Sequence, residues 1–165
     1  MAQITFKDTP INTNGSLPAV GSAAPDFSLV NTDLSTVTLA DFAGKKVILN
    51  IFPSVDTGVC ATQLKTFNQR VAGMDDVVLL FVSLDLPFAY ARFCGAEGIE
   101  NAVTASDFRS LSIGDDYGVK MTDGPLAGLY ARAALVLDAE HNVTYSELVS
   151  EVTHEPNYDA AMAAL

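Results

Sequence analysis

The stretch that decides the fold runs from Lys46 to Asp85 and reads KVILNIFPSVDTGVCATQLKTFNQRVAGMDDVVLLFVSLD. Its two ends, KVILNIF and DVVLLFVSLD, are nearly continuous apolar runs of the kind found in central strands that are covered on both faces. Between them an apolar residue recurs at steps of three and four, the spacing of one buried helical stripe, at Leu64, Phe67, Val71 and Met74. A β-α-β unit is therefore predicted, with parallel strands and a right-handed crossover.

The segments on either side extend this unit into a mixed sheet. Upstream, ITF, FSLV and VTL are short β-like pieces separated by Pro, Gly and Asn. Downstream, PFAYARFCGAEG predicts a helix, NAVTAS a strand and DFRSLSIGDDYGV a broken helical stretch. YARAALVLD and NVTYSELV predict a hairpin around AEH, and EPNYDAAMAAL predicts a closing helix. We expect one domain over residues 1–165, with an α/β, thioredoxin-like fold: a central mixed β-sheet, flanking helices and an N-terminal β extension.

Composition and charge narrow the possible partners. The chain has 165 residues, is 49% hydrophobic, and carries nine Lys plus Arg against 20 Asp plus Glu, a net charge of -11. A surface with this excess of negative charge repels phosphate backbones and anionic lipid. Neither nucleic acid nor a membrane is therefore expected as a partner. The N-terminal MAQITFKDTP lacks the apolar core of a signal peptide, and no apolar run approaches the roughly 20 residues that span a bilayer. A cytoplasmic protein is expected.

The two cysteines, Cys60 and Cys94, are not expected to form a metal site. They are 34 positions apart (94 − 60), and the only histidines, His141 and His154, lie in polar, turn-like segments near the end of the chain. No C-x-x-C or H-x-x-x-H spacing is present, whereas structural zinc needs four ligands. In a reducing compartment such a cysteine pair is usually inert, metal-binding or transiently catalytic. We expect no metal and no bound cofactor, a hairpin position for His141 and a solvated one for His154.

Cys60 lies where the first apolar strand gives way to the helix. In an open α/β sheet, ligands bind outside the carboxyl ends of the strands, which is where Cys60 falls. Asp56 and Thr57 are capping residue types, and Gly58 is a turn former. The unpaired N–H groups of a helix start favour an anion such as a thiolate. Since free cysteine is also among the most buried residue types, core packing and nucleophilic chemistry both remain open at this point.

A threonine stands where related chemistry would use a second thiol. Thioredoxin-like redox enzymes place C-x-x-C at this strand-to-helix turn, and here the spacing reads Thr57-Gly58-Val59-Cys60. Without the neighbouring thiol, a rapid local disulfide cannot form, whereas a hydroxyl both donates and accepts hydrogen bonds. The replacement favours a thiolate that attacks an external electrophile.

The pattern P-x-x-x-T-x-x-C, filled by Pro53, Thr57 and Cys60, resembles the signature of the peroxiredoxin family. Together with DLPFAYARFC and DGPLAGLYARAALVLD, the block NIFPSVDTGVC is similar to the bacterial thiol peroxidase branch, the atypical two-cysteine type. The resemblance extends over essentially the whole chain, from GSAAPDFSLV to the last helix.

The resemblance implies a role for five residues. Cys60 would be the peroxidatic nucleophile, Thr57 would hydrogen-bond the thiolate and the peroxide, and Pro53 would shield the sulfur from water. Arg132 would lie over the thiolate, and Cys94 would be the resolving cysteine. It also implies a thiol-dependent peroxidase acting on hydrogen peroxide and organic hydroperoxides, a Cys60 sulfenic acid, an intramolecular Cys60–Cys94 disulfide, thioredoxin as the reductant and a homodimer.

Two other functions fit the same residues. A redox sensor would use the Cys60–Cys94 pair to pass oxidation to a partner, and a redox-inert thioredoxin-like module would only bind. Phe88 and Tyr90, close to Cys94, are candidates for an apolar rim of the substrate cleft, although core packing would suit at least one of them. The two cysteines belong to different helical segments, and a disulfide needs Cα atoms within about 7 Å. Oxidation is therefore expected to require local unwinding, which Gly95 and Gly98 would ease.

Overall fold

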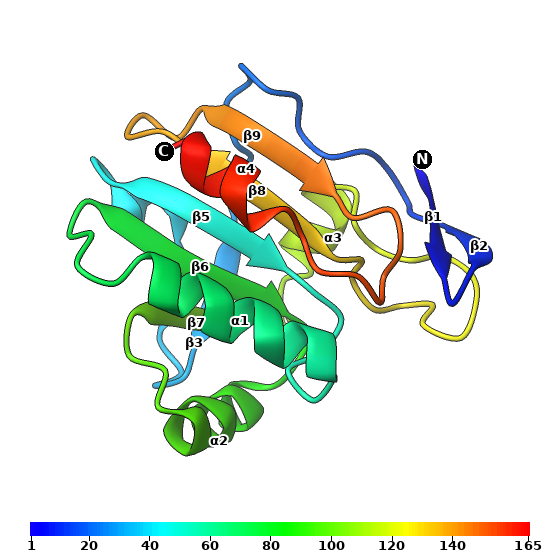
Figure 1. The fold of residues 1–165 in the computed structure, drawn as a ribbon, viewed down its shortest axis with the longest axis horizontal. Coiled ribbons are helices and arrows are strands. Elements are labelled where there is room, and N and C mark those ends of the chain that lie inside the picture. The colour runs from blue at the N-terminus through cyan, green and yellow to red at the C-terminus, as the bar shows by residue number, and fades with distance from the viewer.

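A seven-stranded mixed sheet forms the centre of the computed structural model, which describes residues 1–165 (Figure 1). The strand order is β4-β3-β7-β6-β5-β8-β9, in which β5, β6 and β7 are parallel and the other neighbouring pairs are antiparallel. The strands are β3 (Ser28–Asn31), β4 (Thr36–Thr38), β5 (Lys46–Ile51), β6 (Val77–Ser83), β7 (Ala102–Ser106), β8 (Ala133–Leu137) and β9 (Val143–Leu148). The predicted α/β class, parallel centre and terminal hairpin are confirmed.

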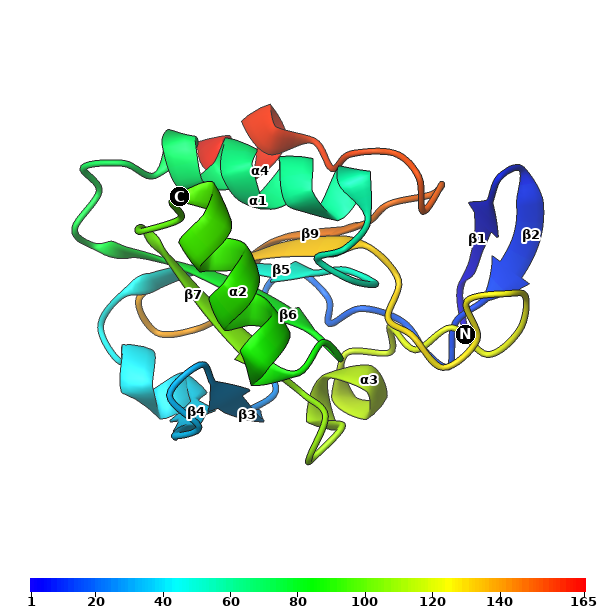
Figure 2. The same cartoon turned by 90° about the horizontal axis from the view of Figure 1, so that it is seen from below.

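Helices cover both faces of this sheet. Figure 2 shows α1 and α4 together on one face and α3 on the opposite side. The helices are α1 (Gly58–Arg70), α2 (Pro87–Glu97), α3 (Ser112–Asp116) and α4 (Tyr158–Ala163), with a 3-10 turn, η1, at Leu39–Phe42. None of these helices combines the length and the apolar character needed to cross a membrane.

Two apolar cores lie on the two faces, and β5 contributes to both. Val47, Leu49 and Ile51 belong to the core shared with α3. Ile48 and the following Phe52 belong to the core shared with α1, α2 and α4. All five side chains are fully buried. Successive strand residues point to opposite faces, so a continuous apolar run is what a strand covered on both faces requires.

The predicted helical stripe is too long at its C-terminal end. Helix α1 ends at Arg70, Val71 is its C-cap, and Met74 lies in the following turn with an exposed side chain. Gly73, with φ +83°, turns the chain toward β6 before another helical turn can form. Met74 therefore does not continue the stripe.

A short hairpin precedes the sheet and projects from it (Figures 1 and 2). It joins β1 (Gln3–Phe6) to β2 (Thr9–Asn12). The two turn residues, Lys7 and Asp8, both have positive φ, as a tight hairpin turn requires. The sequence pattern predicts β1 but not β2. Pro10 weakened the strand pattern there, although proline is tolerated in edge strands such as this one.

Candidate active site

Cys60 lies at the carboxyl end of β5, as its position between strand and helix predicted. It is the third residue of α1 and is completely buried in the core shared by α1, α2 and α4. Its sulfur is a free thiol. It therefore lies within the first helical turn, where the backbone N–H groups have no intrahelical partner.

Arg132 extends across the fold to reach this sulfur. The residue immediately precedes β8, 72 positions after Cys60, and its Nη1 donates to Cys60 Sγ at 3.2 Å. Its side chain is only 2% exposed, and its Nε donates to the carbonyl of Val152 at 3.0 Å. None of the four ion pairs of the structure includes Arg132. This buried guanidinium therefore faces a sulfur and two neutral oxygens, one of them from Gln63, and no carboxylate.

Two buried amides, neither of which is among the residues predicted from the sequence, support the arginine. Gln63, one turn after Cys60, accepts from Arg132 Nη1 at 2.9 Å through its Oε1. Its Nε2 donates to Asn50 Oδ1 at 3.1 Å. Both amides are completely buried. The signal was present, since Asn50 interrupts the apolar run KVILNIF and Gln63 stands beside the apolar Leu64 on α1.

Thr57 occupies the N-cap position of α1, but its side chain does not cap the helix. Its hydroxyl donates instead to the carbonyl of Ser54 at 3.1 Å. A hydroxyl that donates in this way keeps its lone pairs free to accept a proton donor from outside. Pro53, at the start of the same loop, is buried.

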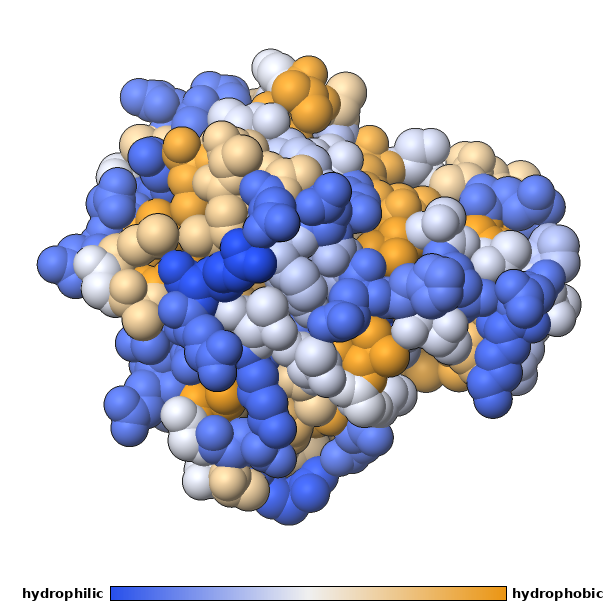
Figure 3. Space-filling view, in the orientation of Figure 1, coloured by the Kyte–Doolittle hydropathy of each residue, from blue (hydrophilic) through white to orange (hydrophobic).

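A small cleft at the start of α1 brings together three of the five candidate residues, Pro53, Thr57 and Arg132, in a volume of about 180 Å³. Its remaining walls include apolar side chains from the N-terminal hairpin and from the chain on either side of β8 and β9: Phe6, Leu126, Leu129 and Val152. Figure 3 shows hydrophobic residues reaching the surface between the body of the domain and the projecting hairpin. The cleft suits a small molecule with a polar end at Arg132 and an apolar remainder.

The suggested rim residues do not line this cleft. Tyr90 is completely buried, and its ring packs edge-on against Phe52 with centroids 6.4 Å apart. Phe88 is 67% exposed on α2 and belongs to the surface outside the cleft. The rim prediction is therefore wrong for Tyr90, for which the alternative, core packing, is confirmed, and Phe88 does not line this cleft. It placed the rim near Cys94, whereas the hairpin and the segment before β8 form the apolar walls.

Cys94 lies outside the cleft. It is half-buried near the end of α2, and its sulfur is 3.8 Å from the hydroxyl of Thr104 on β7. Burial raises the pKa of the Cys94 thiol, although the contact with Thr104 lowers it in part. Cys94 lines a separate pocket of about 420 Å³ between α2 and β7. In this structure each cysteine is therefore a free thiol with its own polar partner.

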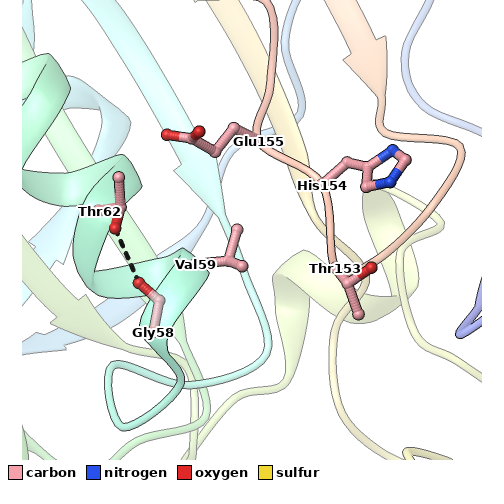
Figure 4. A pocket seen from close by; sticks show the side chains of 6 residues that line it. All are labelled: Gly58, Val59, Thr62, Thr153, His154 and Glu155. Carbon is pink, nitrogen blue, oxygen red and sulfur yellow. Dashed lines mark hydrogen bonds between the residues drawn. The ribbon is translucent and has the colours of Figure 1, made fainter.

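A third pocket, of about 520 Å³, flanks the start of α1 (Figure 4). Figure 4 shows Val59 between the helix start and the segment after β9, which carries Thr153, His154 and Glu155. The hydroxyl of Thr62 donates to the carbonyl of Gly58 at 3.0 Å. His154 is exposed here, as predicted, and His141 lies in the turn between β8 and β9.

Known proteins resemble this chain over its whole length. The redoxin family model matches residues 19–162. Thiol peroxidases from Mycobacterium bovis and Mycobacterium tuberculosis are each 59% identical over 165 residues, which is 100% of this chain and 99% of theirs. A solved structure, a peroxiredoxin-like protein from Aquifex aeolicus, superposes with a TM-score of 0.93 at 37% identity and covers 100% of this chain and 98% of that one. The chain therefore belongs to the redoxin family, as a peroxiredoxin enzyme of the bacterial thiol peroxidase branch.

Proposed function

We propose that this enzyme reduces hydrogen peroxide and organic hydroperoxides through Cys60. The Cys60 thiolate attacks the terminal peroxide oxygen, and the O–O bond breaks. The sulfur becomes a sulfenic acid, while the departing oxygen takes a proton and leaves as water or an alcohol. Cys94 condenses with the sulfenic acid, releasing water and forming an intramolecular disulfide. A dithiol protein, thioredoxin, then supplies two electrons and two protons to restore both thiols.

The contact between Arg132 and Cys60 is the observation that carries this proposal. An unpaired buried charge is costly, and the Arg132 guanidinium is buried without a carboxylate partner. A thiolate at Cys60, 3.2 Å away, would supply the missing negative charge. The arginine would thus place a positive charge and a hydrogen-bond donor beside the reactive sulfur in a site that excludes bulk water.

Ionisation alone does not make an efficient peroxidase. An ordinary thiol is about 3% ionised at pH 7, so complete ionisation gains at most roughly 30-fold in rate. The rest must come from donors that bind the peroxide more strongly as charge moves onto the leaving oxygen. Arg132, the Thr57 hydroxyl and the free N–H groups at the start of α1 are the groups available in the cleft.

The lining of the cleft supports organic hydroperoxides as substrates alongside hydrogen peroxide. A hydroperoxide needs polar contacts only at its O–O end, which would face Arg132 and Thr57. Its alkyl part would lie against Phe6, Leu126 and Val152. Burying apolar carbon there adds affinity that hydrogen peroxide cannot gain. Equal kcat/KM for hydrogen peroxide and cumene hydroperoxide would count against this assignment.

A coupled assay tests the cycle. NADPH consumption is followed with thioredoxin, thioredoxin reductase and excess peroxide. Cys60→Ser should abolish turnover, because an alcohol does not ionise at neutral pH. Cys94→Ser should react once with peroxide and then stop as sulfenic acid or over-oxidise. Turnover by the Cys60 variant would refute the assignment, and a wild-type protein that forms the disulfide but stalls with thioredoxin would be a redox sensor.

The exposed surface at the same end of the sheet supports a homodimer. Four large apolar side chains follow the parallel strands β6 and β7 at their carboxyl ends and are solvent-exposed: Leu86, Phe88, Phe108 and Leu111. We call these four residues the apolar end patch. Exposed apolar side chains gathered in this way mark interaction sites. A second copy of the chain would cover them, because the same patch on both copies forms a two-fold interface.

A further inference from the structure

Asp85 is a carboxylate that the proposed cycle does not use, although it touches the active-site loop. It follows β6 by two residues, and its carboxylate accepts three hydrogen bonds. The donors are Ser54 Oγ at 2.7 Å, the Val55 amide at 2.9 Å and Ser83 Oγ at 2.5 Å. Two of these donors belong to the loop between β5 and α1. Hydrogen bonds to a charged group are stronger than neutral ones, so the carboxylate fixes the path of this loop.

The loop end of this network determines where the Thr57 hydroxyl lies. The Ser54 carbonyl accepts from the Thr57 amide at 3.2 Å and from the Thr57 hydroxyl at 3.1 Å. The Ser54 hydroxyl, which donates to Asp85, accepts from the Asp56 amide at 3.1 Å. A displacement of Ser54 would therefore move Thr57, which lines the cleft. Asp85 itself does not line it.

The other end of the network reaches α2, the helix that carries Cys94. Ser83 Oγ lies 2.6 Å from the hydroxyl of Tyr90, four residues before Cys94. Burial raises the pKa of Tyr90 well above its usual value, so the phenol keeps its proton. Because the Asp85 carboxylate can only accept, Ser83 donates its proton to Asp85 and accepts from Tyr90. The donors therefore converge on Asp85 from two sides, from Tyr90 of α2 through Ser83 and from the loop through Ser54 and Val55.

We propose that Asp85 is a positioning residue that holds the loop from Pro53 to Thr57 in the arrangement that reacts with peroxide, and that Tyr90 makes this hold depend on α2. The inference rests on the proposed Cys60–Cys94 cycle. When α2 unwinds to bring Cys94 to the sulfenic acid, Tyr90 leaves Ser83. The Ser83 hydroxyl then loses its only side-chain donor, and its hold on Asp85 weakens. The arrangement for peroxide attack and the arrangement for disulfide formation thus oppose each other.

Two variants and two rates separate this role from a purely structural one. Asp85→Asn keeps the size of the side chain but leaves one oxygen acceptor in place of two. Tyr90→Phe keeps the ring packed against Phe52 and removes only the donor. The rate of Cys60 oxidation is measured by single-turnover stopped flow in a Cys94→Ser background. The rate of disulfide formation is measured in the chain that retains Cys94, after one equivalent of peroxide, by quenched thiol labelling and mass spectrometry.

We expect the two rates to move in opposite directions. Asp85→Asn should slow peroxide attack by roughly tenfold or more, because the two loop donors, Ser54 Oγ and the Val55 amide, would face a neutral amide with one acceptor oxygen in place of a charged carboxylate with two. The same variant should form the disulfide several-fold faster. Tyr90→Phe should slow peroxide attack less, by up to about threefold, because Asp85 keeps its charge and its loop donors, and should also speed disulfide formation. Ser54→Ala, which removes one loop donor and leaves the carboxylate intact, should reproduce the slower attack if Asp85→Asn folds poorly.

Asp138→Asn is the matched control. Its carboxylate accepts the amides of Glu140 and Asn142 in the turn between β8 and β9, at the opposite end of the sheet from Cys60. Neither rate should change more than twofold. The proposal would be overturned if neither Asp85→Asn nor Ser54→Ala changed the rate of peroxide attack or of disulfide formation. It would also be overturned if both rates fell together in these variants, in proportion to the loss of thermal stability. A wild-type chain that forms no Cys60–Cys94 disulfide would refute the cycle and the link to α2, while the attack rate would still decide whether Asp85 positions the loop.

Discussion

The Thr57 hydroxyl lies at the start of α1 and donates to the Ser54 carbonyl instead of capping the helix. Its oxygen can therefore accept the O–H of a hydroperoxide and orient the O–O bond toward Cys60. Thr57→Val should slow peroxide attack on the order of 10²-fold, and Thr57→Ser should restore most of it. Single-turnover kinetics, together with the thiolate absorbance of Cys60, provide the measurement. A loss that the change in thiolate fraction fully explains would remove the proposed transition-state role.

Gln63 supports Arg132 without reaching the cleft. It accepts from Arg132 Nη1, the same nitrogen that donates to Cys60. Gln63→Leu should remove one of the polar partners of the Arg132 guanidinium, which could then rotate away from the Cys60 sulfur. Peroxide attack should slow by about tenfold. A thermal melt run in parallel provides the control, because a variant that is less stable but attacks peroxide at the wild-type rate would contradict this positioning role.

Sequence patterns reveal local features of the site better than distant ones. Cys60 and Thr57 were visible because they stand at a strand-to-helix turn, where residue types and spacing carry information. Arg132 joins the site from 72 positions away, and a single arginine before a strand has no pattern of its own. Only the family resemblance pointed to it. Gln63 and Asn50 were missed because polar residues next to an apolar run suggest exposure until the fold shows their partners.

At the level of elements, Glu151 connects the N-terminal hairpin to the segment beside the cleft. Burial alone would raise the pKa of Glu151, but hydrogen bonds from Asp8, Thr153 and Thr5 outweigh it and lower the pKa from its usual 4.5 to about 2. A lowered carboxyl pKa stabilises the fold above pH 4.5 and loses this effect as the pH falls from 4.5 toward 2.

Glu151→Gln should therefore destabilise the protein at pH 7 and much less at pH 3. Urea denaturation of the wild type and the variant at both pH values gives the comparison. The hairpin carries Phe6 of the cleft, so the variant should also raise KM for cumene hydroperoxide more than KM for hydrogen peroxide at pH 7. An equal stability difference at both pH values would show that the charge of Glu151 does not hold the hairpin.

The segments that carry the two cysteines should lose protection on oxidation. Helix α2 ends at Gly98 in a left-handed conformation, and Gly95 lowers helix propensity in its last turn. Hydrogen exchange across residues 55–65 and 86–98 should therefore be faster in the disulfide form than in the dithiol form. The strand β8 serves as the internal control. Equal protection of both segments in the two redox states would mean that no unwinding accompanies disulfide formation.

Secondary structure could be predicted where periodicity is strong and failed where one residue ended or hid it. The apolar runs that became β5 and β6 and the stripe that became α1 were clear because burial on defined faces imposes a period. Gly73 ended α1 before Met74, and Pro10 hid β2. The walls of the cleft could not be predicted, since Phe6 and Leu129 meet there only through the packing of the hairpin against the segment before β8.

For the molecule as a whole, charge should control assembly through the apolar end patch. Each copy carries a net charge of -11, so two copies repel each other at low salt. Sedimentation should show a dimer whose dissociation constant falls as the salt concentration rises from about 20 mM to about 200 mM, values that lie on either side of physiological ionic strength. Phe88→Asp should shift the protein to a monomer, and Leu34→Asp, an exposed apolar site on another edge, should not. A wild-type monomer at micromolar concentration would refute the dimer.

Cys60 is completely buried, and its partner Arg132 lines the cleft of about 180 Å³, so access through this cleft would decide which oxidants can reach the sulfur. Oxidants would then be selected by their size and by their rate of entry into the cleft, more than by their reduction potential. We therefore expect slim molecules with a terminal O–O group to gain access, and glutathione disulfide, chloramines on proteins and bulky alkylating reagents to be held outside. Such a thiol would react with hydroperoxides and remain nearly inert toward bulkier electrophiles.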